Sequence, residues 1–350
     1  MQSYSYLILI FTFLLLGSCG SNSDTKKNPF SISTNGSFDK KLKMHTIAKN
    51  KLLKLSITNH NNIPIDSVTY HYNKTNIGKQ TILNDFKLGI QQIKATIYFQ
   101  GDSTSTSQSI QILNDKPPKL FTFDIINEYP HDITSYTQGL EFYNGYLYES
   151  TGQRGQSKLR KVNYKTGEVL KNIVLKPQYF GEGLTIKDNR ILQLTWQGGK
   201  GFIYNRDTFD KLDEFYFEKS KEGWGLCNNG ENIYKSDGTE KIWLLDPKSL
   251  KETDYIQTYT NKGKIVGINE LEWVNGKIFA NRYQLDGVAI INPSNGGIEG
   301  VIDFRALKKK VTQHQGLDVL NGLAWNPTSQ TLFVTGKRWD KLFEVKIIEQ

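Results

Sequence analysis

Cysteine and methionine are nearly absent from this chain of 350 residues, which contains two of each. Histidine is scarce as well, with five residues, and His45, His60 and His71 all precede residue 115. The sequence therefore gives little support to hydrolysis by a nucleophile that a histidine activates. Cys227 precedes a turn signal, residues 228–230, and has no histidine near it in sequence, so we expect it to be structural.

Clustered positive charge is also lacking, although the formal net charge is +9. The lysines are scattered, and residues 308–310 form the one short run. Without a basic helix face or a known module we expect a solvated basic surface and no binding of nucleic acid. Aromatic residues make up 12% of the chain and hydrophobic residues 37%. This composition, with much Thr, Ile and Val, indicates a globular protein rich in strands.

The N-terminus carries an apolar run, residues 7–16, that is interrupted by Thr12 alone. It is too short to span a bilayer, which needs about 20 residues, and is typical of a signal-peptide core. The run ends in Leu16-Gly17-Ser18-Cys19, a sequence typical of a bacterial lipobox, in which the cysteine becomes the lipidated first residue. Residues 20–28 are polar and suit a flexible tether.

We therefore predict an exported lipoprotein of the bacterial cell envelope, in the periplasm or at the outer membrane. Its membrane contact would be the lipid on Cys19 alone. Residues 1–6 contain no Lys or Arg, so a plain cleaved signal peptide with an incidental cysteine is the alternative. If Cys19 is lipidated, Cys227 is the remaining thiol and no intramolecular disulfide can form.

The composition changes at residues 115–119, where adjacent prolines predict a linker between two domains. Before it, residues 29–114 contain short runs that alternate apolar and polar side chains, such as 53–57 and 93–99. Their length and spacing predict a small immunoglobulin-like β-sandwich. This part has no clustered histidines, carboxylates or cysteines, and we interpret it as a spacer or adhesion domain.

The remainder, residues 120–350, repeats with a period of roughly 40 to 50 residues, and each copy contains three or four short strands. The copies begin at Gln138, Glu182, Trp224, Asn269 and Asn321. Such a period is typical of propeller blades, so the sequence predicts an all-β protein with a five-bladed β-propeller. The last copy is short, and we expect residues 120–126 to supply its missing outer strand.

Equivalent positions in successive blades converge on one mouth of the central channel. Besides the first residues, the second strand of each copy yields another set, at its fifth aligned place: Gly152, Trp196, Gly238, Tyr283 and Lys337. Four of the five first residues are polar, where crowding favours small or apolar side chains. Polar groups that converge with aromatic rings and a lysine predict a pocket for a small polar ligand. A polar network that merely fills the channel is the alternative.

Longer runs surround these positions: residues 136–140, 147–152, 180–185, 193–196, 223–226, 269–272 and 334–337. In sequence and order they resemble the plant and bacterial glutaminyl cyclase family, over nearly all of residues 127–348. The resemblance implies a five-bladed propeller that converts the N-terminal glutamine of peptides or proteins to pyroglutamate and releases ammonia. It also implies that no zinc or other cofactor takes part. Residues 29–114 lie outside the resemblance.

By this resemblance Glu182 is the proton shuttle, and Gln138, Asn269 and Lys337 occupy further family positions. In the reaction the α-amine attacks the side-chain amide carbon, and the amide nitrogen must be protonated to leave. One carboxylate can accept the proton of the amine and pass it to that nitrogen. Gln138, Asn269 and Lys337 would hold the amide and its developing oxyanion.

The resemblance also covers an aromatic wall. Trp196 and Trp224 match tryptophans of the family, whereas Tyr136 stands where Phe is usual and Tyr283 where a third Trp is usual. Both substitutions keep an aromatic ring and add a hydroxyl group, which bears on substrate preference. With Asn321 at the mouth, these side chains are expected to enclose the folded-back glutamine.

Two other functions fit the same residues. Glutamate and asparagine around a channel also suit a calcium-dependent lactonase propeller, although Trp224 and the ammonium of Lys337 disfavour a cation there. A non-catalytic surface propeller that binds peptides or glycans is the second alternative.

Overall fold

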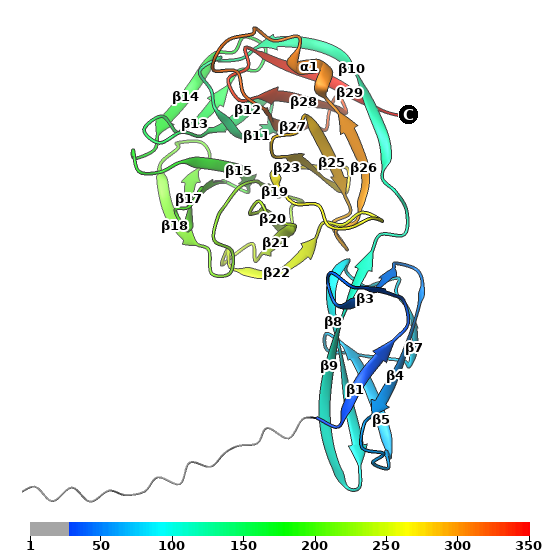
Figure 1. Cartoon of the computed structure of the whole chain (residues 1–350). Helices are drawn as coiled ribbons and strands as arrows, with labels where there is room; N and C mark the ends of the chain where they lie inside the picture. Colours follow the sequence, from blue (N-terminus) through cyan, green and yellow to red (C-terminus); the bar gives the residue numbers. More distant parts are fainter. Residues whose placement is uncertain (1–27) are drawn as a thin grey trace, which may run out of the picture.

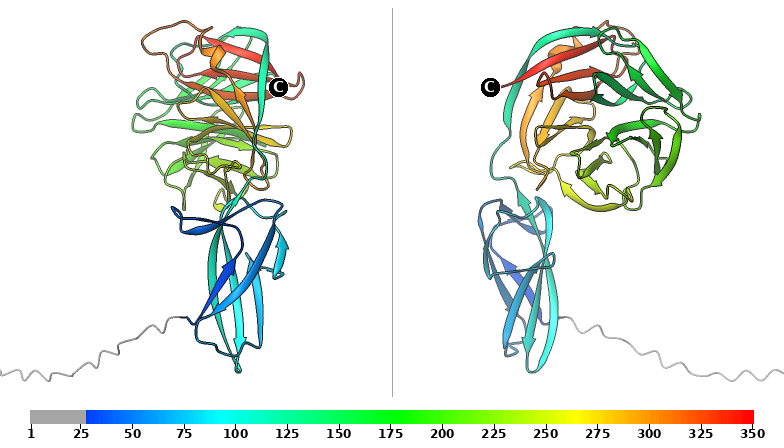
Figure 2. Two further views of the ribbon diagram at one scale, coloured as in Figure 1. Left: turned by 45° about the vertical axis from the view of Figure 1, so that its right-hand side comes forward. Right: turned by 180° about the vertical axis from the view of Figure 1, so that it is seen from behind.

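The computed structural model describes residues 28–350. In this range the chain forms strands β1–β29 and the short helix α1 (Arg305–Lys308). Figures 1 and 2 show a smaller body of N-terminal strands and a larger ring of sheets. No helix within residues 28–350 is long and apolar enough to cross a membrane. The signal sequence, Cys19 and most of the tether lie outside the described residues, so those expectations stay predictions.

The smaller body consists of two sheets. One has the order β1-β4-β7, from β1 (Phe30–Thr34), β4 (Leu52–Asn59) and β7 (Gln80–Ile82). The other has the order β2-β3-β9-β8-β5-β6, from β2 (Ser37–Asp39), β3 (Met44–Ala48), β9 (Asp102–Leu113), β8 (Gly89–Phe99), β5 (Ser67–Tyr72) and β6 (Thr75–Ile77).

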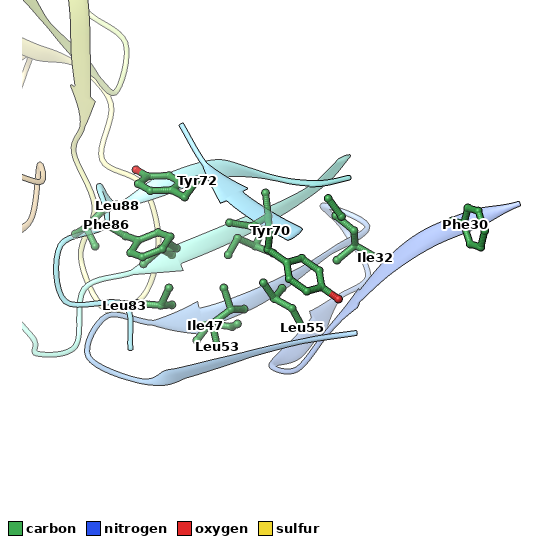
Figure 3. Packing of buried hydrophobic residues seen from close by; sticks show 14 of the residues in the cluster. Phe30, Ile32, Ile47, Leu53, Leu55, Tyr70, Tyr72, Leu83, Phe86 and Leu88 are labelled. Carbon is green, nitrogen blue, oxygen red and sulfur yellow. The ribbon is translucent and has the colours of Figure 1, made fainter. Parts of the chain in front are cut away.

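Apolar side chains from both sheets meet in one core. Alternate residues of β4 and β8 face inward, as the sequence pattern predicts: Leu53 and Leu55 are buried in β4, and Ile93 and Ile97 in β8. Figure 3 shows Ile47, Leu53, Leu55 and Tyr70 gathered between the strands. The period-2 alternation thus gives each sheet one apolar face.

Three four-stranded antiparallel sheets form much of the larger body. They are β11 (Thr137–Tyr143), β12 (Tyr146–Thr151), β13 (Lys158–Val162) and β14 (Val169–Val174); β15 (Gly181–Lys187), β16 (Arg190–Thr195), β17 (Lys200–Asn205) and β18 (Lys211–Tyr216); and β19 (Leu226–Asn228), β20 (Ile233–Ser236), β21 (Lys241–Leu245) and β22 (Glu252–Gln257).

An eight-stranded sheet completes the ring, in the order β23-β24-β25-β26-β10-β29-β28-β27. Its strands are β23 (Ile268–Val274), β24 (Lys277–Arg282), β25 (Gly287–Ile291), β26 (Ile298–Asp303), β10 (Lys119–Pro130), β29 (Lys341–Glu349), β28 (Thr331–Gly336) and β27 (Leu320–Asn326).

The two ends of the larger body are joined by β10. This strand pairs antiparallel with the C-terminal β29, from Phe121 opposite Glu349 to Pro130 opposite Lys341. Its first residues also pair in parallel with β26. The expectation that residues 120–126 supply an outer strand is therefore confirmed, and the strand is longer than predicted. Backbone pairing between the two ends of the larger body, β10 and β29, resists opening of the ring.

The first strands of the sheets, β11, β15, β19, β23 and β27, lie around the middle of the ring, each beside the next, with β27 beside β11 (Figure 1). Their backbones approach too closely for most side chains. A Cβ at Gly225 would lie 2.0 Å from the carbonyl oxygen of Asn269. The recurring glycine after the first position of a repeat therefore permits this packing, whereas Glu270 occupies that place in the fourth copy.

The two bodies share a packed interface. Tyr259 of the larger body is 1% exposed and belongs to the apolar core of the smaller one. The backbone N–H of Asn114 donates to the carbonyl of Thr260 at 3.2 Å, and its side chain donates to Ile298 at 3.2 Å. Lys87 forms an ion pair with Asp254 across the interface. The smaller body is thus packed against the ring in addition to being linked to it.

Candidate active site

A directed chain of hydrogen bonds connects the predicted residues at the mouth of the ring. The Asn269 amide donates to Asn321 at 2.9 Å, and the Asn321 amide donates to Gln138 at 3.2 Å. Gln138 in turn donates through Nε2 to Oε1 of Glu182 at 3.0 Å. All four side chains are at most 5% exposed. The repeat correctly indicated that these residues meet. Glu182 is the last acceptor in this row of hydrogen bonds.

Glu182 lies at the start of β15 and is buried. Burial raises the pKa of this carboxyl well above its ordinary value. The positive charge of Lys337 lowers the pKa, and the negative charge of Glu222 raises it. A buried carboxyl whose pKa is raised next to a charged lysine is a candidate for proton transfer.

Lys337 follows β28 directly and is 2% exposed. Burial lowers the pKa of its ammonium group, whereas the charges of Glu182 and Asp318 raise it. The ammonium lies 4.8 Å from the ring centre of Tyr136 and 5.5 Å from that of Tyr283. These aromatic faces stabilise the cation. Among residues 28–350 no carboxylate lies within ion-pair distance of it, so its N–H groups can donate to a substrate.

The aromatic residues form two connected groups around this mouth. The rings of Trp224 and Tyr283 meet edge to face at 5.4 Å. Phe180, which the sequence analysis did not select, contacts Tyr136 at 6.2 Å and Trp196 at 5.5 Å in the same geometry. Trp224 therefore joins the aromatic wall instead of the amide chain. Tyr283 is the most open of the predicted residues, at 43% exposure.

The two glycines of the second set make room for these rings. A Cβ at Gly152 would lie 2.3 Å from the ring of Phe180. At Gly238 it would lie 2.6 Å from the indole of Trp224. Aromatic side chains from adjacent loops thus occupy the space that a side chain at these positions would need.

Comparison with known proteins matches the family model described as glutamine cyclotransferase to residues 95–347. The match therefore begins within residues 29–114, which the sequence analysis placed outside the resemblance. The chain belongs to the glutamine cyclotransferase family. A glutaminyl-peptide cyclotransferase of Arabidopsis thaliana is 38% identical over 236 residues, which cover 67% of this chain and 73% of the relative. The crystal structure of Myxococcus xanthus glutaminyl cyclase superposes with a TM-score of 0.62 at 33% identity. That match covers 67% of this chain and 99% of the other.

Two further carboxylates, Glu222 and Asp318, accept hydrogen bonds from the aromatic residues of this site. Glu222 accepts hydrogen bonds from the indoles of Trp196 at 2.9 Å and Trp224 at 2.8 Å. Asp318 accepts the hydroxyl hydrogen of Tyr136 at 2.7 Å. Burial and this contact raise the pKa of Tyr136, which keeps its hydroxyl protonated. Both carboxylates precede the repeated positions in sequence, so the repeat gave no signal for them.

A second group of buried carboxyls lies on the inner strands β11 and β23, close in sequence to Gln138 and Asn269. Burial raises the pKa of Glu141 to about 7, and raises the pKa values of Glu270 and Glu272 as well. Glu141 accepts hydrogen bonds from Thr185 and Ile186. No cluster of three or more His, Cys, Asp or Glu within residues 28–350 is arranged to hold a metal ion. The sequence analysis did not identify this group.

Proposed function

We propose that this chain catalyses cyclisation of the N-terminal glutamine of peptides or proteins to pyroglutamate, with release of ammonia. The observation that carries the proposal is the burial of Glu182 at the end of the amide chain, beside Lys337 and an aromatic wall. Family membership supports the same reaction.

Glu182 is the proton carrier in this proposal. The substrate amine has a pKa of about 8, so about a tenth of it is already neutral at pH 7. Departure of the amide nitrogen as ammonia is the harder step, because an unprotonated nitrogen leaves poorly. A carboxyl whose pKa is raised accepts the proton of the attacking amine and delivers it to the leaving nitrogen.

The three amide residues and Lys337 have different roles in this proposal. The donors of Asn269 and Gln138 already serve the chain that ends on Glu182, so we assign them to orienting this carboxylate. Asn321 links the two. Lys337 has free N–H groups and is the best placed to hold the developing oxyanion, a contact whose loss costs about 3–4 kcal/mol in comparable sites.

The aromatic side chains form the binding pocket in this proposal. Trp196 and Trp224 would enclose the aliphatic part of the substrate glutamine, and Tyr136 and Tyr283 would close the side next to Lys337. Holding the side chain folded back on its own amine supplies the orientation that a five-membered ring closure needs.

We also propose the finer architecture that the sequence predicts. The larger body, residues 120–350, is interpreted as a five-bladed propeller, which the circular arrangement of its inner strands supports. Residues 29–114 are interpreted as an immunoglobulin-like β-sandwich, and the linker as residues 115–119. Lipidation at Cys19 would place the enzyme in the cell envelope, held to the membrane by its lipid alone and without a nucleic acid partner.

Ammonia release from a dipeptide that begins with glutamine tests the function. Protein lacking residues 1–20 is assayed with excess EDTA, and pyroglutamyl product is identified by mass spectrometry. We expect stoichiometric ammonia and pyroglutamate. Binding of the dipeptide without turnover would instead favour a binding propeller, and an esterase activity that appears only with calcium would favour the lactonase.

A further inference from the structure

One carboxylate oxygen of Glu222 accepts hydrogen bonds from the indole N–H groups of both tryptophans at the mouth. Oε2 accepts from Nε1 of Trp196 at 2.9 Å and from Nε1 of Trp224 at 2.8 Å. Its other oxygen accepts from Gln197 at 3.2 Å. Trp196 follows β16 and Trp224 precedes β19, so a single carboxylate ties together two neighbouring sheets at the pocket.

The backbone of Glu222 is also held by a hydrogen bond. Its carbonyl oxygen accepts a hydrogen bond from the ammonium of Lys235 at 2.9 Å. Lys235 is fully buried and forms an ion pair with Glu252 at 3.1 Å. Ser220 contacts both charged groups. The loop that carries Glu222 and Trp224 therefore rests on a buried ionic network, which fixes its position.

Two charged residues act on Glu182 from different elements. Lys337 follows β28, and Glu222 lies on the loop before β19. Their effects are opposite, because a nearby cation favours the carboxylate and a nearby anion disfavours it. Asp318 and Tyr136 lie next to Lys337 and modulate it in turn. Glu222 thus touches the aromatic wall and also contributes to the electrostatics of the proton carrier.

We propose that Glu222 is a positioning residue, whose oxygens orient Trp196 and Trp224 for substrate binding and whose negative charge acts on Glu182. The inference rests on the proposed function of the site. It separates two contributions of one side chain: its oxygens as hydrogen-bond acceptors and its negative charge.

Two substitutions separate these contributions. Glu222→Gln retains an acceptor oxygen and removes the charge, so the pKa of Glu182 falls. The limb of the pH profile of kcat/KM that Glu182 governs then moves to lower pH. Glu222→Ala removes both contributions, and we expect it also to lower kcat/KM by roughly ten- to a hundredfold, mainly through KM. Glu218→Gln is the matched control, because Glu218 lies on the same loop and pairs with Lys251 at the surface.

NMR measures the orientation of the two tryptophans independently of activity. In 15N-labelled protein the indole N–H signals of Trp196 and Trp224, assigned with Trp196→Phe and Trp224→Phe, should shift in the Glu222→Ala variant. They should remain unchanged in Glu218→Gln. This measurement needs no turnover, so it tests the positioning role even if the proposed reaction is absent.

Either of two results would overturn the inference. One is a pH profile of Glu222→Gln that coincides with that of wild type. The other is an unchanged pair of indole signals in Glu222→Ala. Failure of the wild-type enzyme to release ammonia would count against the proposed function alone.

Discussion

The amide nitrogen of Gln138 lies 3.0 Å from Oε1 of Glu182 and donates a hydrogen bond to it. Each is the second residue of the first strand of its sheet, β11 or β15, and the two are 44 positions apart in sequence. Their contact is the last step of the chain that begins at Asn269. It holds the buried carboxylate in one orientation, which is the basis of the first prediction.

Gln138→Leu should lower kcat by about tenfold, the effect expected when one hydrogen bond to a charged group is lost. The side chain no longer orients Glu182, whereas the aromatic pocket remains intact and KM changes little. Steady-state kinetics with a glutaminyl dipeptide measure both constants. A rise in KM at constant kcat would assign Gln138 to substrate binding instead.

Glu182→Gln should reduce kcat by at least a hundredfold, because the amide can neither accept nor deliver the proton. The substitution preserves size and removes a buried carboxyl, so we expect the protein to remain folded. Circular dichroism and thermal unfolding check the fold, and ammonia release checks activity. Turnover within tenfold of wild type would show that another group carries the proton.

Lys337→Met should lower kcat by roughly a hundred- to a thousandfold if its ammonium stabilises the oxyanion. Loss of the positive charge also raises the pKa of Glu182, because Lys337 favours the ionised carboxylate. The limb of the pH profile that Glu182 governs therefore moves to higher pH, opposite to the movement expected for Glu222→Gln. An unchanged midpoint would separate Lys337 from the electrostatics of Glu182.

Lys235→Met should destabilise the fold by about 3–5 kcal/mol, since Glu252 would stay buried without its cation. The free energy of unfolding in urea measures this change. Lys251→Ala is the control, because Lys251 pairs with Glu218 at the surface and such pairs contribute at most about 1 kcal/mol. Equal effects of the two substitutions would contradict the structural role of the buried pair.

The raised pKa of Glu141 predicts that the free energy of unfolding falls as the pH rises. Its pKa is about 7 in the folded protein against an ordinary value of 4.5, so the folded state holds the proton over that interval. Its contribution is complete below about pH 4.5 and is lost as the pH rises through 7. Glu141→Gln should therefore reduce the loss of unfolding free energy between pH 5 and pH 8, by on the order of 1–2 kcal/mol. Parallel curves for variant and wild type would refute this assignment.

The sequence by itself determined the all-β class, the repeat and the meeting of Gln138, Glu182, Asn269 and Asn321. A repeat places equivalent residues at equivalent heights around a ring, so their convergence can be read without coordinates. The alternation in β4 and β8 likewise predicts which side chains enter the core. The repeat also placed Lys337 and the two tryptophans at this mouth, and the family resemblance implied their roles.

Only the tertiary structure decided which groups act on these residues. Glu222, Asp318 and Phe180 lie outside the repeated positions, and their roles come from contacts between adjacent loops. The direction of the amide chain and the docking of Tyr259 into the smaller body depend on side-chain placement in the same way. Periodicity encodes the position of a residue along its strand, whereas partners across loops depend on packing in three dimensions.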